Sequence, residues 1–237
     1  MKLDKAVVFV TGANRGLGEE FARQALAGGA RKVYAAARDP ATVTLPGVVP
    51  VRLDVTDPAQ VAQAAADCGD VTLVINNAGI ASTGSLLAAD SVEAMRRMFD
   101  TNVAGVLQVC QAFAPALARN GGGALLNVLS VTSWISSSFL GAYAATKSAA
   151  WSVTNGLRIE LEQQGTQVLG LHVGYIDTEL ARPFDAPKMS PQAVVERAYA
   201  ALEQGQSEVL IDETSQKVKQ ALTAESPIYL AAIKRPG

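Results

Sequence analysis

Histidine, cysteine and aromatic residues are scarce in this chain of 237 residues. There is one histidine, and the two cysteines, Cys68 and Cys110, form no C-x-x-C pair. No cluster of metal-ligand residue types appears, so the sequence predicts no metal site and no disulfide framework. We expect two buried free thiols in a reducing compartment. Aromatic residues make up only 5% of the chain, which leaves alanine and valine to fill the core.

Charge is also sparse, and long apolar runs are missing. Charged residues make up 18% of the chain, the formal net charge is −2, and no basic block occurs. This composition argues against nucleic acid or an anionic membrane surface as the main partner. No apolar run reaches the roughly 20 residues that span a membrane. Residues 1–5 lead directly into a strand-like run without a signal peptide, so we expect a cytoplasmic protein.

Valine-rich runs alternate with helical stretches along the whole chain. The expected strands are 6–11, 32–37, 49–53, 71–75, 124–129, 167–172 and 208–211; the expected helices are 16–27, 58–66, 91–119, 142–162 and 190–203. Pro115 is expected to bend or shorten the 91–119 helix. The alternation predicts an α/β fold, a doubly wound parallel sheet of about seven strands with helices on both faces (Rossmann fold). We expect one domain over 1–237, with a short substrate loop around 175–190.

A glycine-rich loop, T-G-A-N-R-G-L-G at 11–18, joins the first expected strand to the first helix. Gly12 allows a tight turn, Gly16 lets a diphosphate approach the backbone, and Gly18 allows close packing of helix and strand. The helix N-terminus then offers free amides to phosphates. The spacing differs from G-x-G-x-x-G, and a simple glycine turn is the alternative. The flanking strand and helix favour nucleotide binding.

The end of the second expected strand bears on which dinucleotide binds. Ala37 stands where an acid would bind the ribose diol of NAD, and Arg38 follows it. Arg15 in the glycine loop is a second cation that could meet a 2′-phosphate. This pattern favours NADP over NAD. The alternatives are that both arginines are solvated, or that Asp39 governs the ribose site.

Three polar residues lie where chemistry at a carbonyl is expected. Tyr143 and Lys147 are four residues apart and share one face of a helix. A nearby ammonium lowers the pKa of a tyrosine, whose phenol can then exchange a proton near neutral pH. Ser130 follows an expected strand, at the sheet edge where ligands bind. Y-x-x-x-K also occurs on solvated helix faces, so the surrounding motifs must decide.

Those motifs, in this order, resemble the short-chain dehydrogenase/reductase family, in its compact, carbonyl reductase-like branch. The resemblance covers nearly the whole chain and includes the glycine loop, Asn76-Asn77-Ala78-Gly79, and Ser130 followed by Tyr143-x-x-x-Lys147. It implies the catalytic residues Asn102, Ser130, Tyr143 and Lys147. It implies that the cofactor is bound by Gly12, Asn14, Arg15, Gly16, Leu17, Arg38, Asp54, Val55, Asn76, Ala78, Gly79, Tyr143, Lys147, Gly174, Ile176 and Thr178.

The resemblance also implies a mechanism. Ser130 orients the substrate oxygen, Tyr143 exchanges a proton with it as hydride moves between substrate and nicotinamide, and Lys147 binds the nicotinamide ribose and lowers the Tyr143 pKa. Asn102 marks a helix irregularity and holds a water that connects Lys147 to solvent. One departure is Val173, which replaces the proline of the family's P-G-x-x-x-T, so the cofactor loop is expected to be less rigid.

The expected walls of the substrate site, including Trp134 and Tyr175, are apolar and indicate an apolar or aromatic ketone or aldehyde. The other reading of the chain is a non-catalytic dinucleotide-binding sensor or scaffold. By analogy with the family, residues 91–119 and 142–162 form a homodimer or homotetramer interface. The single histidine, His172, is expected to be a satisfied core residue rather than a catalyst.

Overall fold

The computed structural model describes residues 1–182 and 184–230. Residue 183 of the expected substrate loop and residues 231–237 of the expected domain lie outside this description. The strands are β1 Val7–Thr11, β2 Lys32–Ala37, β3 Val49–Arg52, β4 Leu73–Asn76, β5 Ala124–Val128, β6 Gln167–His172 and β7 Glu208–Leu210. The helices are α1 Gly16–Ala27, α2 Pro58–Asp67, α3 Ser91–Phe99, α4 Val106–Arg119, α5 Gly141–Glu160, α6 Pro191–Glu203 and α7 Glu213–Ala221.

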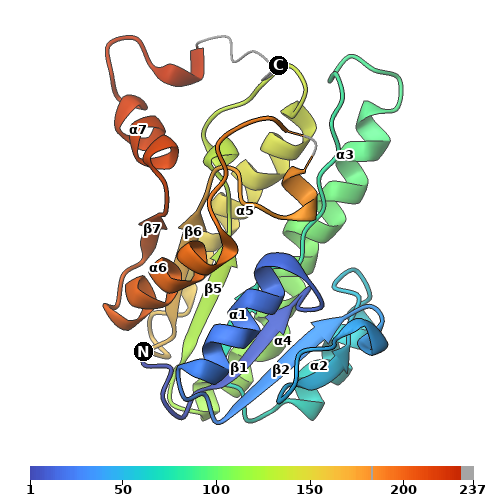
Figure 1. Cartoon of the computed structure of the whole chain (residues 1–237), viewed down its shortest axis with the longest axis vertical. Helices are drawn as coiled ribbons and strands as arrows, with labels where there is room; N and C mark the ends of the chain where they lie inside the picture. Colours follow the sequence, from blue (N-terminus) through green and yellow to red (C-terminus); the bar gives the residue numbers. More distant parts are fainter. Residues whose placement is uncertain (183, 231–237) are drawn as a thin grey trace.

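The strands form one seven-stranded sheet in the order β3-β2-β1-β4-β5-β6-β7. Every neighbouring pair is parallel. The chain runs outward from β1 to β3 and then crosses back to β4 on the other side of β1 (Figure 1). Ligand sites in such sheets lie outside the carboxyl ends of the strands at this crossover. The predicted doubly wound parallel sheet is confirmed.

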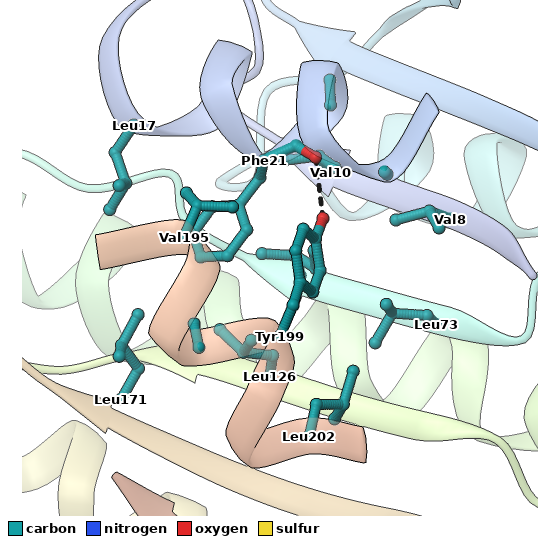
Figure 2. Close-up of a cluster of buried hydrophobic side chains, with 14 of the residues drawn as sticks. Val8, Val10, Leu17, Phe21, Leu73, Leu126, Leu171, Val195, Tyr199 and Leu202 are labelled. Carbon is teal, nitrogen blue, oxygen red and sulfur yellow. Dashed lines mark hydrogen bonds between the residues drawn. The ribbon is translucent and has the colours of Figure 1, made fainter. Parts of the chain in front are cut away.

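Helices α1 and α6 cover one face of the sheet, where Phe21 and Tyr199 pack edge to face with their ring centroids 5.5 Å apart (Figure 2). The Tyr199 hydroxyl donates a 2.7 Å hydrogen bond to the Phe21 carbonyl. This bond satisfies a polar group that would otherwise be unpaired in an apolar layer. The layer is built largely from valine, leucine and alanine, as the low aromatic content implies.

The opposite face is covered by α2, α4 and α5, with Phe9 and Phe113 at its centre and their ring centroids 4.5 Å apart. Cys68 and Cys110 are buried in this layer as free thiols. Burial raises the pKa of each thiol to about 12. The expected buried, unpaired cysteines are therefore confirmed, and both are poor nucleophiles because the thiolate is the reactive form.

The long helix expected over 91–119 is interrupted, but not at Pro115. That residue lies inside α4, which continues to Arg119. The interruption is a π-helical segment, Asp100–Gly105, between α3 and α4. A Cβ on Gly105 would lie 2.7 Å from Cγ2 of Val55, so glycine permits the close approach of this segment to the sheet.

The sequence analysis stopped at the last strand and missed α7. Asp212 caps this helix by accepting a 2.8 Å hydrogen bond from the Ser215 amide. The sequence signal for this helix was Asp212, a residue type that favours the N-cap position, where its side chain can accept from the amide three positions later. Among the described residues, no helix combines the length and apolar character needed to cross a membrane.

Candidate active site

A cavity of about 1210 Å³ opens at the carboxyl ends of the central strands. It extends from the glycine loop after β1, past the ends of β2, β4 and β5, to the segment after β6. This is the edge at which the strand order reverses, so the topology alone accounts for its position. Its two ends differ in the residues that line them.

The glycine loop has the backbone expected of a phosphate cradle. Gly12 and Gly16 have φ values of 65° and 56°, which favour glycine. A Cβ on Gly18 would lie 2.2 Å from the Gly12 carbonyl oxygen, so no other residue fits there. Arg15, the N-cap of α1, makes no capping bond with its side chain. The first amides of α1 therefore have no side-chain acceptor, and the loop fits the diphosphate of a dinucleotide.

Asn77, part of the Asn76–Gly79 motif, holds this loop. Its side-chain amide donates to the carbonyls of Thr11 and Gly12 at 2.9 and 3.1 Å. The Thr11 hydroxyl in turn accepts from the amides of Asn77 and Ala78, both at 3.0 Å. The turn after β4 is thus fastened to the turn after β1, which keeps the cradle open.

Asn76 does not line the cavity, contrary to the predicted cofactor contact. Its side chain is buried and donates to Oδ1 of Asn127 at 2.8 Å and to Cys110 Sγ at 3.2 Å. Asn76 is the last residue of β4 and its side chain points into the core, whereas Asn77, in the turn after the strand, reaches the glycine loop. Apart from Asn76, the predicted cofactor residues line it: Gly12, Asn14, Arg15, Gly16, Leu17, Arg38, Asp54, Val55, Ala78, Gly79, Tyr143, Lys147, Gly174, Ile176 and Thr178.

Arg15 and Arg38 are exposed at the same end of the cavity. Asp39, the acid that could have opposed them, is not part of the lining. Its carboxylate caps the short 3-10 helix Pro40–Thr42 by accepting from the Ala41 amide at 3.1 Å. Arg15 forms a 2.5 Å ion pair with Glu179. Both arginines are therefore at the cavity, and one of them already holds an anionic partner.

Ser130, Tyr143 and Lys147 meet in the middle of the cavity. Ser130 lies two residues beyond the end of β5, and the other two lie one turn apart on α5. The Ser130 hydroxyl oxygen accepts from the amide and the hydroxyl of Thr132, at 3.1 and 3.0 Å. Lys147 Nζ donates to the Val128 carbonyl at 2.9 Å and lies 5.7 Å from the centre of the Tyr143 ring.

Burial dominates the electrostatics of this group. It lowers the pKa of Lys147 to about 8, because the low-dielectric surroundings disfavour the ammonium. Burial also raises the pKa of Tyr143, and a hydrogen bond with the Ser130 hydroxyl opposes that rise. The expectation that the Lys147 ammonium lowers the Tyr143 pKa does not hold here, since desolvation of the phenolate outweighs the other effects.

Asn102 lies in the π-helical segment, where a helix irregularity was expected. Its side chain clamps Ile80, accepting from the Ile80 amide at 2.9 Å and donating to the Ile80 carbonyl at 2.8 Å. It also donates to the Thr146 hydroxyl at 3.1 Å. A Cβ on Gly79 would lie 3.3 Å from Asn102 Oδ1 and 4.0 Å from Lys147 Nζ, so glycine lets this turn lie close to both groups.

The other end of the cavity is apolar. Tyr175 and Phe184 pack with ring centroids 5.1 Å apart, and Phe139 lies 6.0 Å from Phe184. Ile80, Ala81, Ile135, Leu140 and Leu180 complete this wall. Tyr175 is therefore at the predicted place.

Trp134 is not. It does not line the cavity, because the 3-10 turn Val131–Ser133 that follows Ser130 directs its ring toward His172 and Trp151. Within the described residues, no group of three or more histidine, cysteine or acidic side chains is arranged to hold a metal ion.

Comparison with known proteins gives a family. The profile described as "short chain dehydrogenase" matches residues 6–188. Galactitol 2-dehydrogenase (L-tagatose-forming) of Cereibacter sphaeroides is 35% identical over 190 residues, which cover 76% of this chain and 74% of the relative. Dehydrogenase/reductase SDR family member 7B of Bos taurus is also 35% identical, over 194 residues, covering 74% of this chain and 59% of the longer bovine protein.

A crystal structure of a short-chain dehydrogenase from Burkholderia cenocepacia, in complex with NADP, is similar over 95% of both chains. The TM-score is 0.91 and the sequence identity 40%. The profile covers most of the chain, including the glycine loop and the Ser130, Tyr143 and Lys147 group. The chain therefore belongs to the short-chain dehydrogenase/reductase family of oxidoreductases.

Proposed function

We propose that this protein is an NADP-dependent oxidoreductase that interconverts a carbonyl compound and an alcohol, with Tyr143 as the acid and base. The observation that carries the proposal is the meeting of the Ser130 hydroxyl, the Tyr143 phenol and the buried Lys147 ammonium in one cavity that also contains the glycine cradle. Binding a dinucleotide does not require a tyrosine and a serine paired in this way.

The dinucleotide and the residues Ser130, Tyr143 and Lys147 have different roles in the proposed reaction. The dinucleotide, held by the glycine cradle and the amides of α1, supplies the hydride when bound. Ser130 donates a hydrogen bond to the substrate oxygen and orients it. Tyr143 gives that oxygen a proton during reduction and takes one during oxidation. Lys147 stabilises the phenolate left after proton transfer, and its approach to the phenol on binding would lower the Tyr143 pKa.

Asn102 serves this group by holding the segment that faces Lys147. The clamp on Ile80 fixes the cavity wall beside Gly79. Gly79 lies close to both Lys147 and Asn102, and in this proposal a water beside it passes a proton from Lys147 toward Asn102. In this proposal Asn102 acts through the wall and a bridging water, and not by touching the substrate.

Arg15 and Arg38 favour NADPH over NADH. Both are at the cavity end that would receive the adenine ribose, and a 2′-phosphate placed between them would gain charge-assisted hydrogen bonds. The capping role of Asp39 removes the acid that would have favoured NADH. The similar Burkholderia cenocepacia structure, whose complex contains NADP, supports the same choice.

The apolar wall formed by Phe139, Tyr175 and Phe184 favours apolar or aromatic ketones and aldehydes. A polyol such as the substrate named for the galactitol dehydrogenase relative would leave hydroxyl groups unpaired against this wall. Initial rates of NADPH and NADH oxidation with aromatic ketones, aliphatic aldehydes and sugar ketones test the preference for NADPH and the preference for apolar substrates together. NADH-dependent turnover confined to sugar ketones would contradict both.

We also propose a homodimer or homotetramer that uses the outer faces of α3 and α5. Phe99 and Ile159 are 45% and 74% exposed, large apolar side chains that a partner helix would cover. Light scattering coupled to size exclusion measures the mass directly. A monomer at micromolar concentration would exclude this arrangement.

The competing reading is a sensor that binds the dinucleotide without chemistry. Tyr143→Phe separates the two, because it removes only the phenolic oxygen. Loss of turnover with unchanged NADPH binding supports the enzyme. A wild-type protein that binds NADPH but turns over no carbonyl of any tested class would favour the sensor.

A further inference from the structure

We infer that His172 is a positioning residue for Ser130, and that Glu208 and Lys219 hold its ring in place from β7 and α7. The inference rests on the proposed function of Ser130. It assigns a role to a histidine that the sequence indicates only as a core residue, and to a helix that the sequence analysis missed.

The first contact fixes the edge of the ring. His172 is the last residue of β6 and is fully buried. Its Nδ1 lies 3.2 Å from the Ser130 carbonyl oxygen. A carbonyl oxygen only accepts, so this contact assigns the proton to Nδ1. The same oxygen accepts from the Ser133 amide at 3.0 Å, so His172 adds a long-range restraint to a bond made within the local turn.

The second contact lies across the ring. Nε2 of His172 is 3.3 Å from Oε1 of Glu208, an ion-pair contact that requires a proton on Nε2 as well and is not a hydrogen bond. The other oxygen of that carboxylate accepts from Lys219 Nζ at 2.6 Å. The interaction with His172, assisted by Lys219, lowers the pKa of Glu208 to about 2, although burial opposes this. The carboxylate is therefore ionised at neutral pH, facing one nitrogen of His172 on one side and an ammonium on the other.

The third contact covers the face of the ring. The Trp134 indole stacks on His172, with a centroid distance of 3.9 Å and an interplanar angle of 19°. Lys219 Nζ lies 4.7 Å from the centre of the Trp134 ring, a cation–π distance. Ser130 and Trp134 are only four residues apart, so this short segment contacts both the edge and the face of one imidazole.

These contacts explain how the fold fixes the catalytic serine. The amides of Leu129 and Val131, on either side of Ser130, donate at 2.8 Å each to the carbonyls of Leu171 and Val173, on either side of His172. His172 restrains the Ser130 carbonyl. The backbone of Ser130, whose side chain carries the hydroxyl, cannot rotate without breaking that contact. A small displacement of a group that positions the substrate lowers turnover strongly, because the reaction needs the reacting atoms within a narrow range of distances and angles.

One test needs no turnover. The chain contains one histidine, so a long-range nitrogen–proton NMR spectrum reports His172 without assignment. The expected spectrum shows a protonated, pyrrole-like Nδ1, retained in Ser130→Ala because the acceptor is a backbone carbonyl. An unprotonated, pyridine-like Nδ1 would overturn the inference.

The second test is kinetic. His172→Asn keeps an amide donor at the Nδ1 position, and His172→Leu removes it. We expect His172→Leu to lower kcat by about tenfold with the KM for NADPH unchanged within about twofold, and His172→Asn to recover most of the loss. Equal losses in the two variants, or a change in urea unfolding alone, would mean that the histidine only supports folding.

Glu208→Gln is the reserve variant in case the leucine variant does not fold, because it preserves shape and removes the charge behind the ring. We expect it to lower kcat with unchanged NADPH affinity; an unchanged kcat would overturn the role of the Glu208 contact. Absence of turnover in the wild type would overturn the proposed function instead. The NMR spectrum would then still decide, by itself, whether His172 holds the Ser130 carbonyl.

Discussion

The carboxylate of Asp212 accepts a 2.6 Å hydrogen bond from the backbone amide of Gly174. Gly174 lies in the cavity lining after β6, where Val173 replaces the proline typical of the family. The other oxygen of Asp212 caps α7 through the Ser215 amide. A side chain at the start of α7 thus restrains the backbone of the cavity-lining segment after β6, which was expected to be less rigid without the proline.

Replacing Asp212 therefore has two expected effects. Asp212→Ala should raise the KM for NADPH several-fold and lower the free energy of unfolding by about 1 kcal/mol, the usual effect of losing a helix cap. Asp212→Asn keeps an acceptor oxygen, so it should reverse part of the rise in the KM for NADPH and recover part of the loss in the free energy of unfolding. Steady-state kinetics and urea unfolding measure the two effects. An unaltered KM in Asp212→Ala would show that the loop is held without this bond.

Tyr143→Phe removes the proposed proton donor and leaves the ring in place. We expect kcat to fall by about 10²–10⁴-fold, the range typical of a positioned acid or base. NADPH binding, followed by fluorescence titration, should change by less than about twofold. Tyr175→Phe is the matched control, since it removes a phenol from the same cavity, outside the Ser130 group. A comparable loss in both variants would contradict the assignment to Tyr143.

Arg38→Ala should lower kcat/KM for NADPH by about tenfold and leave that for NADH nearly unchanged, because charge-assisted contacts to a phosphate contribute about 1.5–3 kcal/mol. Glu179→Gln provides the counterpart. It releases Arg15 from its ion pair and should improve NADPH use slightly. Loss of NADH activity in Arg38→Ala would show instead that this arginine supports the fold or the ribose in general.

Lys147 gives a prediction about stability and pH. Its pKa in the folded protein is about 8, against 10.5 for the ordinary side chain. Between these values the unfolded chain binds more protons, so the free energy of unfolding rises with pH through this window. The stability of the wild type relative to Lys147→Met should therefore increase from about pH 8 to pH 10.5. Chemical denaturation at several pH values measures it, and a flat difference would place the folded pKa near its ordinary value.

The local patterns of the sequence determined much of this protein. Alternating strands and helices predicted the parallel sheet, because each element must bury a continuous apolar face whatever its neighbours are. The glycine loop was found because its backbone requirements are local, and Gly18 is indispensable at its position. Ser130, Tyr143 and Lys147 were singled out because a strand end and a helical spacing place them by short-range geometry, and because the surrounding motifs resemble those of one family.

Only the tertiary structure decided which side chains reach the cavity. Asn76 and Asn77 are adjacent, yet the first ends β4 and is buried against Cys110, while the second lies in the turn after the strand and contacts the glycine loop. Trp134 was predicted at the substrate wall, but the turn after Ser130 carries it onto His172. Side-chain direction at the end of a strand depends on the register of its neighbours, which residue order does not contain.

The electrostatic environment was likewise a product of packing. The helical spacing predicted that Lys147 would lower the pKa of Tyr143, whereas burial raises it in the folded chain. The contacts of Glu208, Asp212 and Lys219 join segments more than thirty-five residues from the groups they restrain. Periodicity and short motifs determined the fold and the candidate site residues, because those depend on local geometry. Long-range packing decided what holds and tunes them, because desolvation and contact require the whole chain to be folded.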